Sequence, residues 1–394
     1  MGTTLRRLRK SVQKLAKWAG LSPAETKLAT DVVRGVSARG SCHLSEIGRA
    51  LDEPCELIET ERRLSEGLSD PKSGLDAMRI GWLREVTPTA AKMPFIACDM
   101  TDLRKPYGKT FEFLDTVRDA SDRRKHLEPG YWSVQIEATD DQHRNLPLWS
   151  ETFSTKADDY RGWWQTVERG LLQVVARVGT TTTWLFDRGF DAIEFFRVLQ
   201  FVGLVWVVRQ MQTRQIVVGD GEVISTRQLA SDLRKPYATA LPYVDKSTHQ
   251  MREYPVSFGY APVRLLDLEG RFWIIVITGL RDEDMVLLTN ARIDHWRDAE
   301  RIVLAYLRRW GCEEGTRVWK QSTKVEDFRV RNYDSIRRLT FLSMLAYGIQ
   351  ALWLLRRPSL ARKLIARVKV FIENVPFLHY RLWAGVADAL LSRA

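Results

Sequence analysis

The sequence predicts an α/β protein with helical segments at both ends, and three patterns indicate this fold class. The first 78 or so residues show helical periodicity without strand-like alternation. Short apolar runs then alternate with helical segments, and a stretch of short strand patterns separated by Gly and Asp follows. We therefore divide the chain into a helical N-terminal domain (1–78), the first part of an α/β core (79–212), a β-rich insertion (213–292), the last part of the core (293–332) and a C-terminal helical region (333–394).

The chain is long and basic. Its 394 residues exceed what one compact domain usually holds, and 45% hydrophobic with 28% charged residues is typical of a folded protein. The formal net charge of +11 favours a polyanionic partner, because a protein that neutralises phosphates releases their condensed counterions. A folded protein with a basic surface and no nucleic-acid partner is the alternative.

Cysteine usage and hydropathy predict a cytoplasmic protein outside the membrane. The four cysteines lie far apart and form no CxxC pair, which excludes a zinc ribbon and favours a reducing compartment. The basic N-terminus leads into no apolar leader segment. The longest uncharged run, 339–355, lies at the lower limit for a membrane span and is better interpreted as a buried helix.

The N-terminal part contains a helix-turn-helix pattern. A short helix is predicted at Leu44–Leu51, a break at Asp52–Pro54, and a second helix from Leu57 to Leu64 that carries Arg62 and Arg63. Arginines on the second helix suit a reader of the DNA major groove, which would make residues 1–78 a helical DNA-binding domain. A plain helical hairpin fits the same pattern, and the residues do not separate the two interpretations.

The middle of the chain predicts a ribonuclease H-like core. Its order of elements is three strands, a helix, a strand, a helix and a strand, which matches that fold. The predicted strands are Phe95–Cys98, Tyr131–Thr139, Leu148–Ser154, Trp184–Phe186 and Leu204–Val208, and the predicted helices are Tyr160–Val178 and Asp191–Val202.

Two acids, Asp99 and Asp187, each follow a short apolar strand directly. Open α/β sheets place their chemistry at such strand ends. Carboxylates are hard oxygen ligands suited to Mg²⁺, and two such ions can activate a nucleophile and stabilise the leaving oxygen in phosphoryl transfer. Taken singly, however, a strand-terminal Asp more often caps a helix or closes a turn.

A third acid, Glu313, lies in the segment Tyr306–Lys320. On one continuous helix at 100° per residue, five side chains share a stripe about 80° wide. The five residues are Tyr306, Arg309, Glu313, Arg317 and Lys320. A solvated face with an i,i+4 ion pair is the alternative. Gly311 and Gly315 destabilise a plain helix, and close approach by another backbone would explain their presence.

These residues resemble a known family. The spacing Y-x2-R-x3-E-x6-K from Tyr306 to Lys320 is similar to the signature of DDE transposases in the bacterial insertion-sequence group founded by the element IS-four. The run from Asp187 to Asp191, Asp-Arg-Gly-Phe-Asp, resembles that family's second catalytic region, and Asp99 with Thr101 resembles the first. The β-rich insertion between the second Asp and the Glu is also typical of the group. The resemblance covers roughly residues 90–325.

The resemblance implies a cut-and-paste DNA transposase. Asp99, Asp187 and Glu313 would be its catalytic residues and would hold two Mg²⁺ ions, for which Mn²⁺ is expected to substitute. The partners implied are double-stranded DNA, as terminal inverted repeats and target, and a second copy of the chain in a homodimer. The expected location is the bacterial cytoplasm, in association with the nucleoid. Helices from about residue 333 onward are candidate dimerisation elements, although their apolar face could equally pack on the core.

The DNA contacts follow from the same resemblance. Phosphate contacts are expected from Tyr306, Arg309, Arg317 and Lys320, with Arg188 as a further contact. A flipped base in relatives stacks on a tryptophan of the insertion, a contact worth about 1–3 kcal/mol. Trp273 and Trp296 are the candidates, and either could be a core residue instead.

Some alternatives stay open at the level of sequence. Glu314 is adjacent to Glu313, and Asp102 is a rival to Asp99. A structure-specific nuclease with the same core, or a non-catalytic DNA-binding regulator derived from a transposase, would carry the same motifs.

Overall fold

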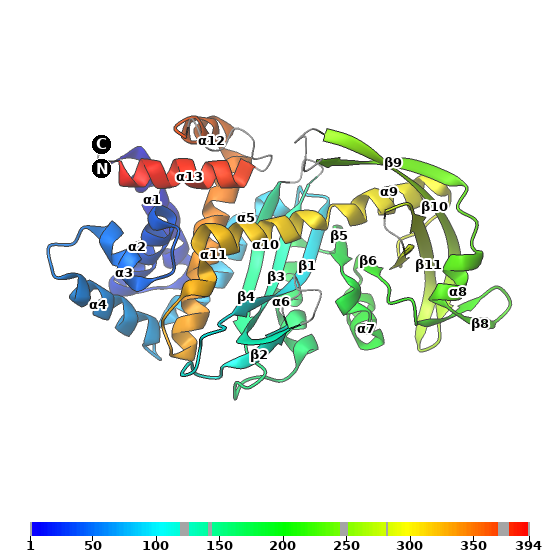
Figure 1. The fold of residues 1–394 in the computed structure, drawn as a ribbon, viewed down its shortest axis with the longest axis horizontal. Helices are drawn as coiled ribbons and strands as arrows, with labels where there is room; N and C mark the ends of the chain where they lie inside the picture. Colours follow the sequence, from blue (N-terminus) through cyan, green and yellow to red (C-terminus); the bar gives the residue numbers. More distant parts are fainter. Residues whose placement is uncertain are drawn as a thin grey trace.

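The fold is seen in a computed structural model of the chain (Figure 1). The structure describes residues 2–118, 126–140, 144–244, 251–280, 283–368 and 378–392.

The N-terminal end is helical, as the sequence predicts. Both predicted helices of the helix-turn-helix are present, and the second extends to Ser69. The helices are α1 Thr3–Ala19, α2 Pro23–Arg39, α3 Leu44–Leu51, α4 Leu57–Ser69 and α5 Met78–Ala90, with a 3₁₀ turn η1 at Gly74–Ala77. Ser22 and Glu25 form a capping box at the start of α2, which satisfies two otherwise unpaired N–H groups.

The core strands pair in the order β4-β3-β1-β5-β6. β3 is antiparallel to β1 and β4, whereas β5 is parallel to β1 and β6. The core elements are β1 Phe95–Arg104, β2 Asp115–Arg118, β3 Leu127–Thr139, β4 Asn145–Phe153, α6 Trp163–Val178, β5 Thr183–Phe186, η2 Arg188–Phe190, α7 Ile193–Val202 and β6 Val205–Arg209. Every predicted core strand and helix is confirmed. β1 is longer than predicted, and the short strand β2 was not foreseen.

The insertion is β-rich, as predicted, but it is not a separate sheet. Its last strand pairs antiparallel with β6, so core and insertion form one sheet of 12 strands. The insertion contains β7 Gln215–Val218, β8 Glu222–Ser225, β9 Tyr237–Val244, β10 Met251–Leu265, β11 Leu268–Thr278 and β12 Met285–Thr289. It also contains a short helix, α8 Thr226–Asp232, that the sequence patterns did not predict.

The segment Tyr306–Lys320 does not form the single continuous helix that a spacing of 100° per residue presupposes. It is divided between α9 Trp296–Leu307 and α10 Trp310–Thr323. The backbone of Arg308 and Arg309 stays right-handed, and tight i→i+3 bonds join the two helices, with Arg309 N–H donating to the Tyr306 carbonyl at 3.0 Å. The two helices follow one another across the sheet nearly as one rod (Figure 1).

The C-terminal region surrounds a buried helix, α11 Tyr333–Arg356, which follows a 3₁₀ turn η3 at Val325–Asp327. Within the described residues α11 alone is long and apolar enough to cross a membrane, but 94% of its apolar window is buried in the protein. α11 packs against β4, α2 and α4. It is therefore a core helix, as the sequence indicated, and this burial excludes it as a dimerisation element. α12 Pro358–Ile365 and α13 Leu378–Leu391 follow it.

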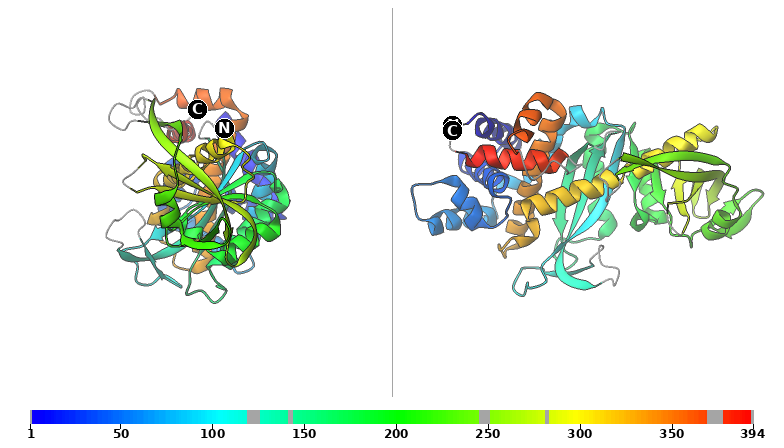
Figure 2. Two further views of the ribbon diagram at one scale, coloured as in Figure 1. Left: turned by 90° about the vertical axis from the view of Figure 1, so that its right-hand side faces the viewer. Right: turned by 45° about the horizontal axis from the view of Figure 1, so that its top comes forward.

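The sheet lies between a helical end and the insertion (Figures 1 and 2). The N-terminal and C-terminal helices gather at the helical end, where both ends of the described chain meet. One sheet face packs on α5 and α6 in a large apolar cluster that includes Ile96 and Cys98. The other face carries Ala97, Leu185 and Val207 in a second cluster beneath α9 and α10. Consecutive residues of β1 therefore face different layers.

Candidate active site

The register of two parallel strands places Asp99 beside Asp187. Cys98 pairs with Phe186 at the end of the β1–β5 ladder, so the next residue of each strand is one of the two acids. Both acids have the parity of the residues that face α9 and α10, because side chains alternate along a strand. The Asp187 carboxylate accepts a hydrogen bond from Gly189 N at 2.8 Å, which starts the turn η2.

The sequence suggested that Asp99 follows the end of its strand, but Asp99 lies within β1. β1 continues to Arg104 through its pairing with β3, whereas β5 stops at Phe186. Asp99 therefore stands where the neighbouring parallel strand ends. The rival acid Asp102 contacts different cations, since its carboxylate oxygens lie 3.4 Å from Arg104 Nε and 3.8 Å from Lys320 Nζ.

Arg309 links Glu313 to this pair of acids. Its guanidinium forms an ion pair with Glu313 in the first turn of α10 and lies 3.9 Å from Asp99 Oδ2. The Arg309 side chain is 8% exposed, and the Asp99 side chain is 20% exposed. Burial raises the pKa of Asp99 to about 7; Arg309 opposes this rise, and the charges of Asp187 and Glu313 add to it. Arg309 thus contacts two of the carboxylates, and the charge of Asp187 also acts on it.

The donor set at this site fits a divalent metal. Hard carboxylate oxygens are the ligands that Mg²⁺ prefers, and a bound cation would favour the charged form of Asp99, whose pKa burial raises to about 7. Among the described residues, no three His, Cys, Asp or Glu side chains stand close enough to hold one ion. Glu313 is engaged with Arg309 instead. Glu313 must therefore break its ion pair with Arg309 before all three acids can bind a metal ion.

Two of the predicted phosphate contacts, Tyr306 and Arg309, are buried. Tyr306 is 2% exposed, burial raises its pKa to about 12, and its ring lies 5.8 Å from the Arg309 guanidinium carbon. In this structure the two residues support the carboxylates from within and do not face solvent. Arg317 is exposed and pairs with Glu314 at 2.7 Å, so Glu314 is engaged away from the acids.

Gly311 and Gly315 allow α10 to lie close to the sheet, as their presence in a helix suggested. A Cβ on Gly315 would stand 2.2 Å from Glu137 Oε2, and a Cβ on Gly311 would stand 2.8 Å from Asn145 Oδ1. Glu137 is 2% exposed, and burial followed by the charge of Asp99 raises its pKa well above the usual range. No sequence motif singled out Glu137. The signal was a lone acid within the alternating strand β3.

The remaining basic residues differ in how available they are. Arg188 is exposed on the turn after Asp187. Arg62 is 70% exposed on α4, with Glu66 4.0 Å away. Arg63 instead forms ion pairs with Asp31 at 2.9 Å and Glu53 at 2.8 Å, which tie α4 to α2 and to the turn before it. Arg63 therefore has a structural role here, while Arg62 stays a predicted groove contact.

Both candidate tryptophans are partly covered by neighbours. Trp296 stacks on Tyr237, with ring centroids 5.7 Å apart and planes 10° apart. Trp273 lies 5.9 Å from Tyr260, and the guanidinium of Arg271 lies 5.0 Å from its ring. Neither is a fully buried core residue. The choice between them stays open.

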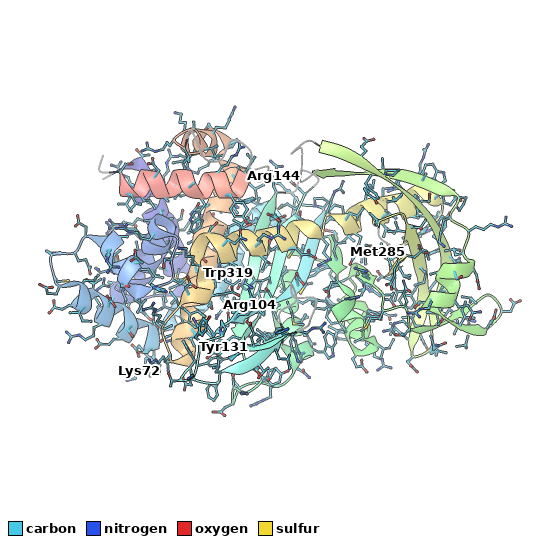
Figure 3. The ribbon with its side chains drawn as sticks, in the orientation of Figure 1. Lys72, Arg104, Tyr131, Arg144, Met285 and Trp319 are labelled. Atoms are coloured by element: carbon cyan, nitrogen blue, oxygen red, sulfur yellow. The ribbon has the colours of Figure 1, made fainter. Side chains whose placement is uncertain are left out.

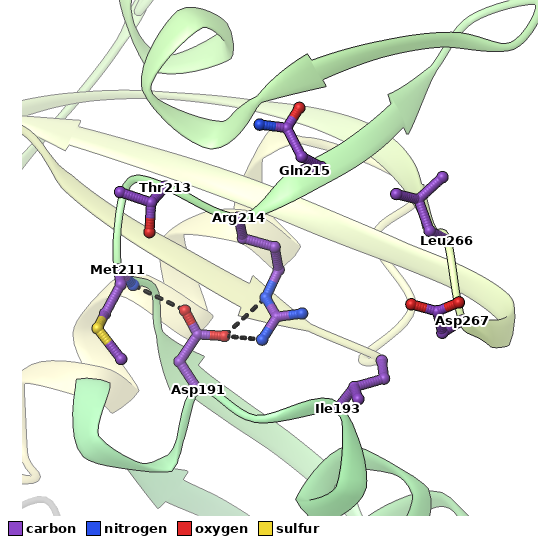
Figure 4. A pocket seen from close by; sticks show the side chains of 8 residues that line it. All are labelled: Asp191, Ile193, Met211, Thr213, Arg214, Gln215, Leu266 and Asp267. Atoms are coloured by element: carbon purple, nitrogen blue, oxygen red, sulfur yellow. Dashed lines mark hydrogen bonds and ion pairs between the residues drawn. The ribbon is translucent and has the colours of Figure 1, made fainter.

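A cavity of about 290 Å³ lies where η2 and α7 meet the insertion (Figure 4). A buried ion pair forms one wall: Asp191 accepts from Arg214 Nε at 2.7 Å and from Met211 N at 2.8 Å. The last residue of the Asp187–Asp191 motif therefore ties the turn after Asp187 to the insertion. The cavity does not contain the three acids.

Fold and site together define an α/β protein with a cluster of carboxylates at the end of neighbouring parallel strands, beneath a helix. The family model described as Transposase DDE domain matches residues 91–349, so the chain belongs to this family and is a transposase of the DDE type. The family implies nuclease and strand-transfer chemistry and general dependence on divalent metal ions.

The chain is also similar to a solved transposase structure. A piggyBac transposase, determined by cryo-EM as a synaptic complex with hairpin DNA, matches with a TM-score of 0.49 and 10% sequence identity. The match covers 99% of this chain and 81% of that one. No curated protein matches the chain.

Proposed function

We propose that this protein is a cut-and-paste transposase of the IS-four type, with the Tyr-Arg-Glu-Lys signature at Tyr306, Arg309, Glu313 and Lys320. Asp99, Asp187 and Glu313 form its catalytic triad on a ribonuclease H-like core. The carrying observation is the strand register, which brings Asp99 beside Asp187 on the sheet face that α10 covers. The strand order β4-β3-β1-β5-β6, with its change from antiparallel to parallel pairing, supports the ribonuclease H-like assignment.

The chemistry proposed is phosphoryl transfer in DNA. Asp99, Asp187 and Glu313 would hold two Mg²⁺ ions, with Mn²⁺ as a substitute; when bound, the ions supply Lewis-acid stabilisation of the attacking and leaving oxygens. The chain's own part is to hold three carboxylates on one face and to offset their charge with Arg309 until the metal binds. Gly315 and Glu137 set how closely α10, and with it Glu313, lies over β1.

The substrate is double-stranded DNA, first the terminal inverted repeats of the element and then the target. The exposed residues Arg62, Arg188 and Arg317 support a backbone-binding role, because phosphate contacts come from accessible cations. Trp296 or Trp273 would stack a flipped base. A homodimer would pair the two ends of the element, and the protein would work in the bacterial cytoplasm at the nucleoid.

The test is cleavage of a linear DNA that carries the gene's own flanking ends, with Mg²⁺ and with EDTA. The wild type is compared with Asp187→Ala and Glu313→Ala, and a joining assay with target DNA follows. Mg²⁺-dependent cuts at the ends, lost in both variants and followed by joining, support the proposal. DNA binding without any cleavage in the wild type would contradict it, and cleavage without joining would indicate a nuclease.

A further inference from the structure

Three donors converge on one carboxylate oxygen beside the C-terminal half of α10. Glu326, in the turn η3, places its Oε1 2.9 Å from Lys320 Nζ and 3.2 Å from the main-chain N of Arg104. The Arg104 Nε lies 3.9 Å from the same oxygen. Arg104 stands at the end of β1 in the central part of the molecule, between the helical end and the insertion (Figure 3). A side-chain cation, a second side-chain cation and a backbone N–H around one oxygen are the elements of an anion-binding subsite.

Lys320 uses all three of its N–H donors within the protein. Besides Glu326, its Nζ lies 2.7 Å from the Asp102 carbonyl oxygen and 3.4 Å from Thr101 Oγ1. An ammonium group has three donors and no acceptor. Lys320 can therefore bind a phosphate only if one protein acceptor leaves. Of the three acceptors, only Glu326 offers a charged side chain that can move; the other two are the Asp102 main-chain carbonyl and the Thr101 hydroxyl.

The Glu326 side chain can leave without a change in the fold. Its main-chain carbonyl is held by the buried Lys105, whose Nζ donates to it at 2.7 Å and also donates to the Phe328 carbonyl. Lys105 Nζ further lies 4.0 Å from the Phe328 ring centroid, so η3 is anchored independently of the carboxylate. The side chains of Glu326, Lys320 and Arg104 are 26%, 18% and 35% exposed. Ion pairs this accessible to water contribute only about 0–1 kcal/mol.

The resemblance already implies a phosphate contact for Lys320; we propose that Arg104 completes a subsite for that DNA backbone phosphate, and that Glu326 occupies the subsite until DNA displaces it. The inference rests on the proposed function, because the DNA is what such an enzyme must bind. The exchange keeps the balance of charge: Lys320 and Arg104 also face the carboxylate of Asp102, and a phosphate that replaces Glu326 adds no further anion to the cluster. The subsite lies five residues along β1 from Asp99, or about 16 Å at roughly 3.3 Å per residue.

The experiment measures binding of a random-sequence duplex in EDTA, where no cleavage occurs, across a range of NaCl concentrations. Glu326→Gln and Glu326→Ala are compared with wild type, each alone and combined with Lys320→Gln. Asp388→Asn is the matched control, because it removes the same charge from a carboxylate that pairs with Arg367 at 2.6 Å on the C-terminal helices. Thermal unfolding of each variant verifies that it is folded.

The expected result is binding about 2- to 5-fold tighter in Glu326→Gln, as expected when a rim ion pair no longer competes. The slope of log K against log salt should be equal in wild type and Glu326→Gln, because DNA displaces Glu326 in the wild type as well, and it should be shallower by up to about 0.9 in Lys320→Gln, which lacks a phosphate contact. The Lys320→Gln background should abolish the tighter binding, and Asp388→Asn should change neither the affinity nor the slope. A wild-type slope in Lys320→Gln, or equal tightening in the Lys320→Gln background, would overturn the subsite.

A second arm identifies the anion. Inorganic phosphate is added at constant ionic strength; it should compete with the duplex poorly, and equally in wild type and Glu326→Gln. Strong competition confined to Glu326→Gln would show a free-phosphate site and overturn the assignment to DNA. The two proposals are tested by different results. Absence of cleavage at element ends would contradict the proposed function even if the Glu326 variants bind DNA as expected. Unchanged DNA binding by the Glu326 variants would contradict the subsite even if cleavage occurs.

Discussion

The two faces of the central sheet differ sharply in what they contribute to the molecule. On the side of α5 and α6, Ile96 and Cys98 of β1 enter a large apolar cluster and are fully buried. On the side of α9 and α10, the same strand presents Asp99, whose pKa burial raises to about 7. One strand therefore stabilises the fold through one set of side chains and assembles like charges through the other. The acidic face therefore lowers the stability of the fold, and the apolar face supplies the stability that offsets this loss.

The largest effect expected on the acidic face is the loss of chemistry in Glu313→Gln. This change keeps the size and one hydrogen-bond acceptor but removes the charge that pairs with Arg309 and that a metal would need. We expect DNA cleavage to fall by about 10³-fold or more, because the carboxylates supply most of the charge arrangement for the reaction. Single-turnover cleavage of end DNA measures this, with Glu314→Gln as the neighbouring control. Near-normal cleavage would remove Glu313 from the triad.

The apolar face should respond in the opposite way, through stability. Trp82 on α5 is 1% exposed, and its Nε1 donates to the Pro147 carbonyl at 2.9 Å. We expect Trp82→Ala to lower the free energy of unfolding by about 3–5 kcal/mol through the cavity it leaves. Urea unfolding measures the loss. The cleavage rate per folded molecule should stay within a few-fold of wild type at low temperature, and a catalytic defect as large as that of Glu313→Gln would contradict the separation of the two faces.

An intermediate effect is expected where α10 meets the sheet. Gly315→Ala places a methyl group 2.2 Å from Glu137 Oε2, so α10 must shift. We expect the free energy of unfolding to fall by about 2 kcal/mol, which is within the usual range for overpacking, and we expect DNA cleavage to be reduced. Adding Glu137→Ala should restore part of both, because it removes the clashing oxygens of a side chain whose raised pKa keeps it neutral. Thermal unfolding and cleavage of the single and double variants test the coupling, and strictly additive effects would exclude it.

The last effect expected has the opposite sign, because Asp99→Asn should raise the free energy of unfolding. An Asp in the unfolded chain loses its proton near pH 3.8, whereas Asp99 in the folded protein keeps it up to a pH of about 7. The unfolded state is therefore favoured increasingly as the pH rises from 3.8 to 7, and this cost is constant above 7. Asn removes the cost, so we expect a gain of up to about 4 kcal/mol at pH 8, at roughly 1.4 kcal/mol per pKa unit, that shrinks toward zero as the pH falls to about 4. Thermal unfolding measured from pH 4 to 8 in roughly unit steps follows this difference, and a gain independent of pH would mean that Asp99 is not the group responsible.

The fold could be predicted from the sequence where periodicity is strong and local. The strands around Tyr131–Thr139 and Trp184–Phe186 have clear apolar patterns, and their order defines the core. The end of β1 was misplaced because Asp99 interrupts the apolar run, while pairing with β3 continues the strand to Arg104. The break between α9 and α10 was missed because Arg308 and Arg309 keep right-handed backbone angles, which a helical wheel does not distinguish from a continuous helix.

The site could be predicted only as a set of residue types. The three acids were selected by strand position and signature, but which cation each one meets depends on tertiary packing. Arg63 illustrates this limit, because its partners Asp31 and Glu53 are far away in sequence or on another element. Glu137 and Glu326 were missed for the same reason: neither belongs to a local motif, and only the fold brings them under or beside α10.

The rod formed by α9 and α10 is a lever between two regions of the molecule. Its first residue, Trp296, stacks on Tyr237 of the insertion strand β9, and its far half lies over β1 with Glu313 near the middle. We therefore expect a tilt of the insertion against the core to change the height of Glu313 above Asp99, so that DNA bound to the insertion would shift a carboxylate near the centre of the rod.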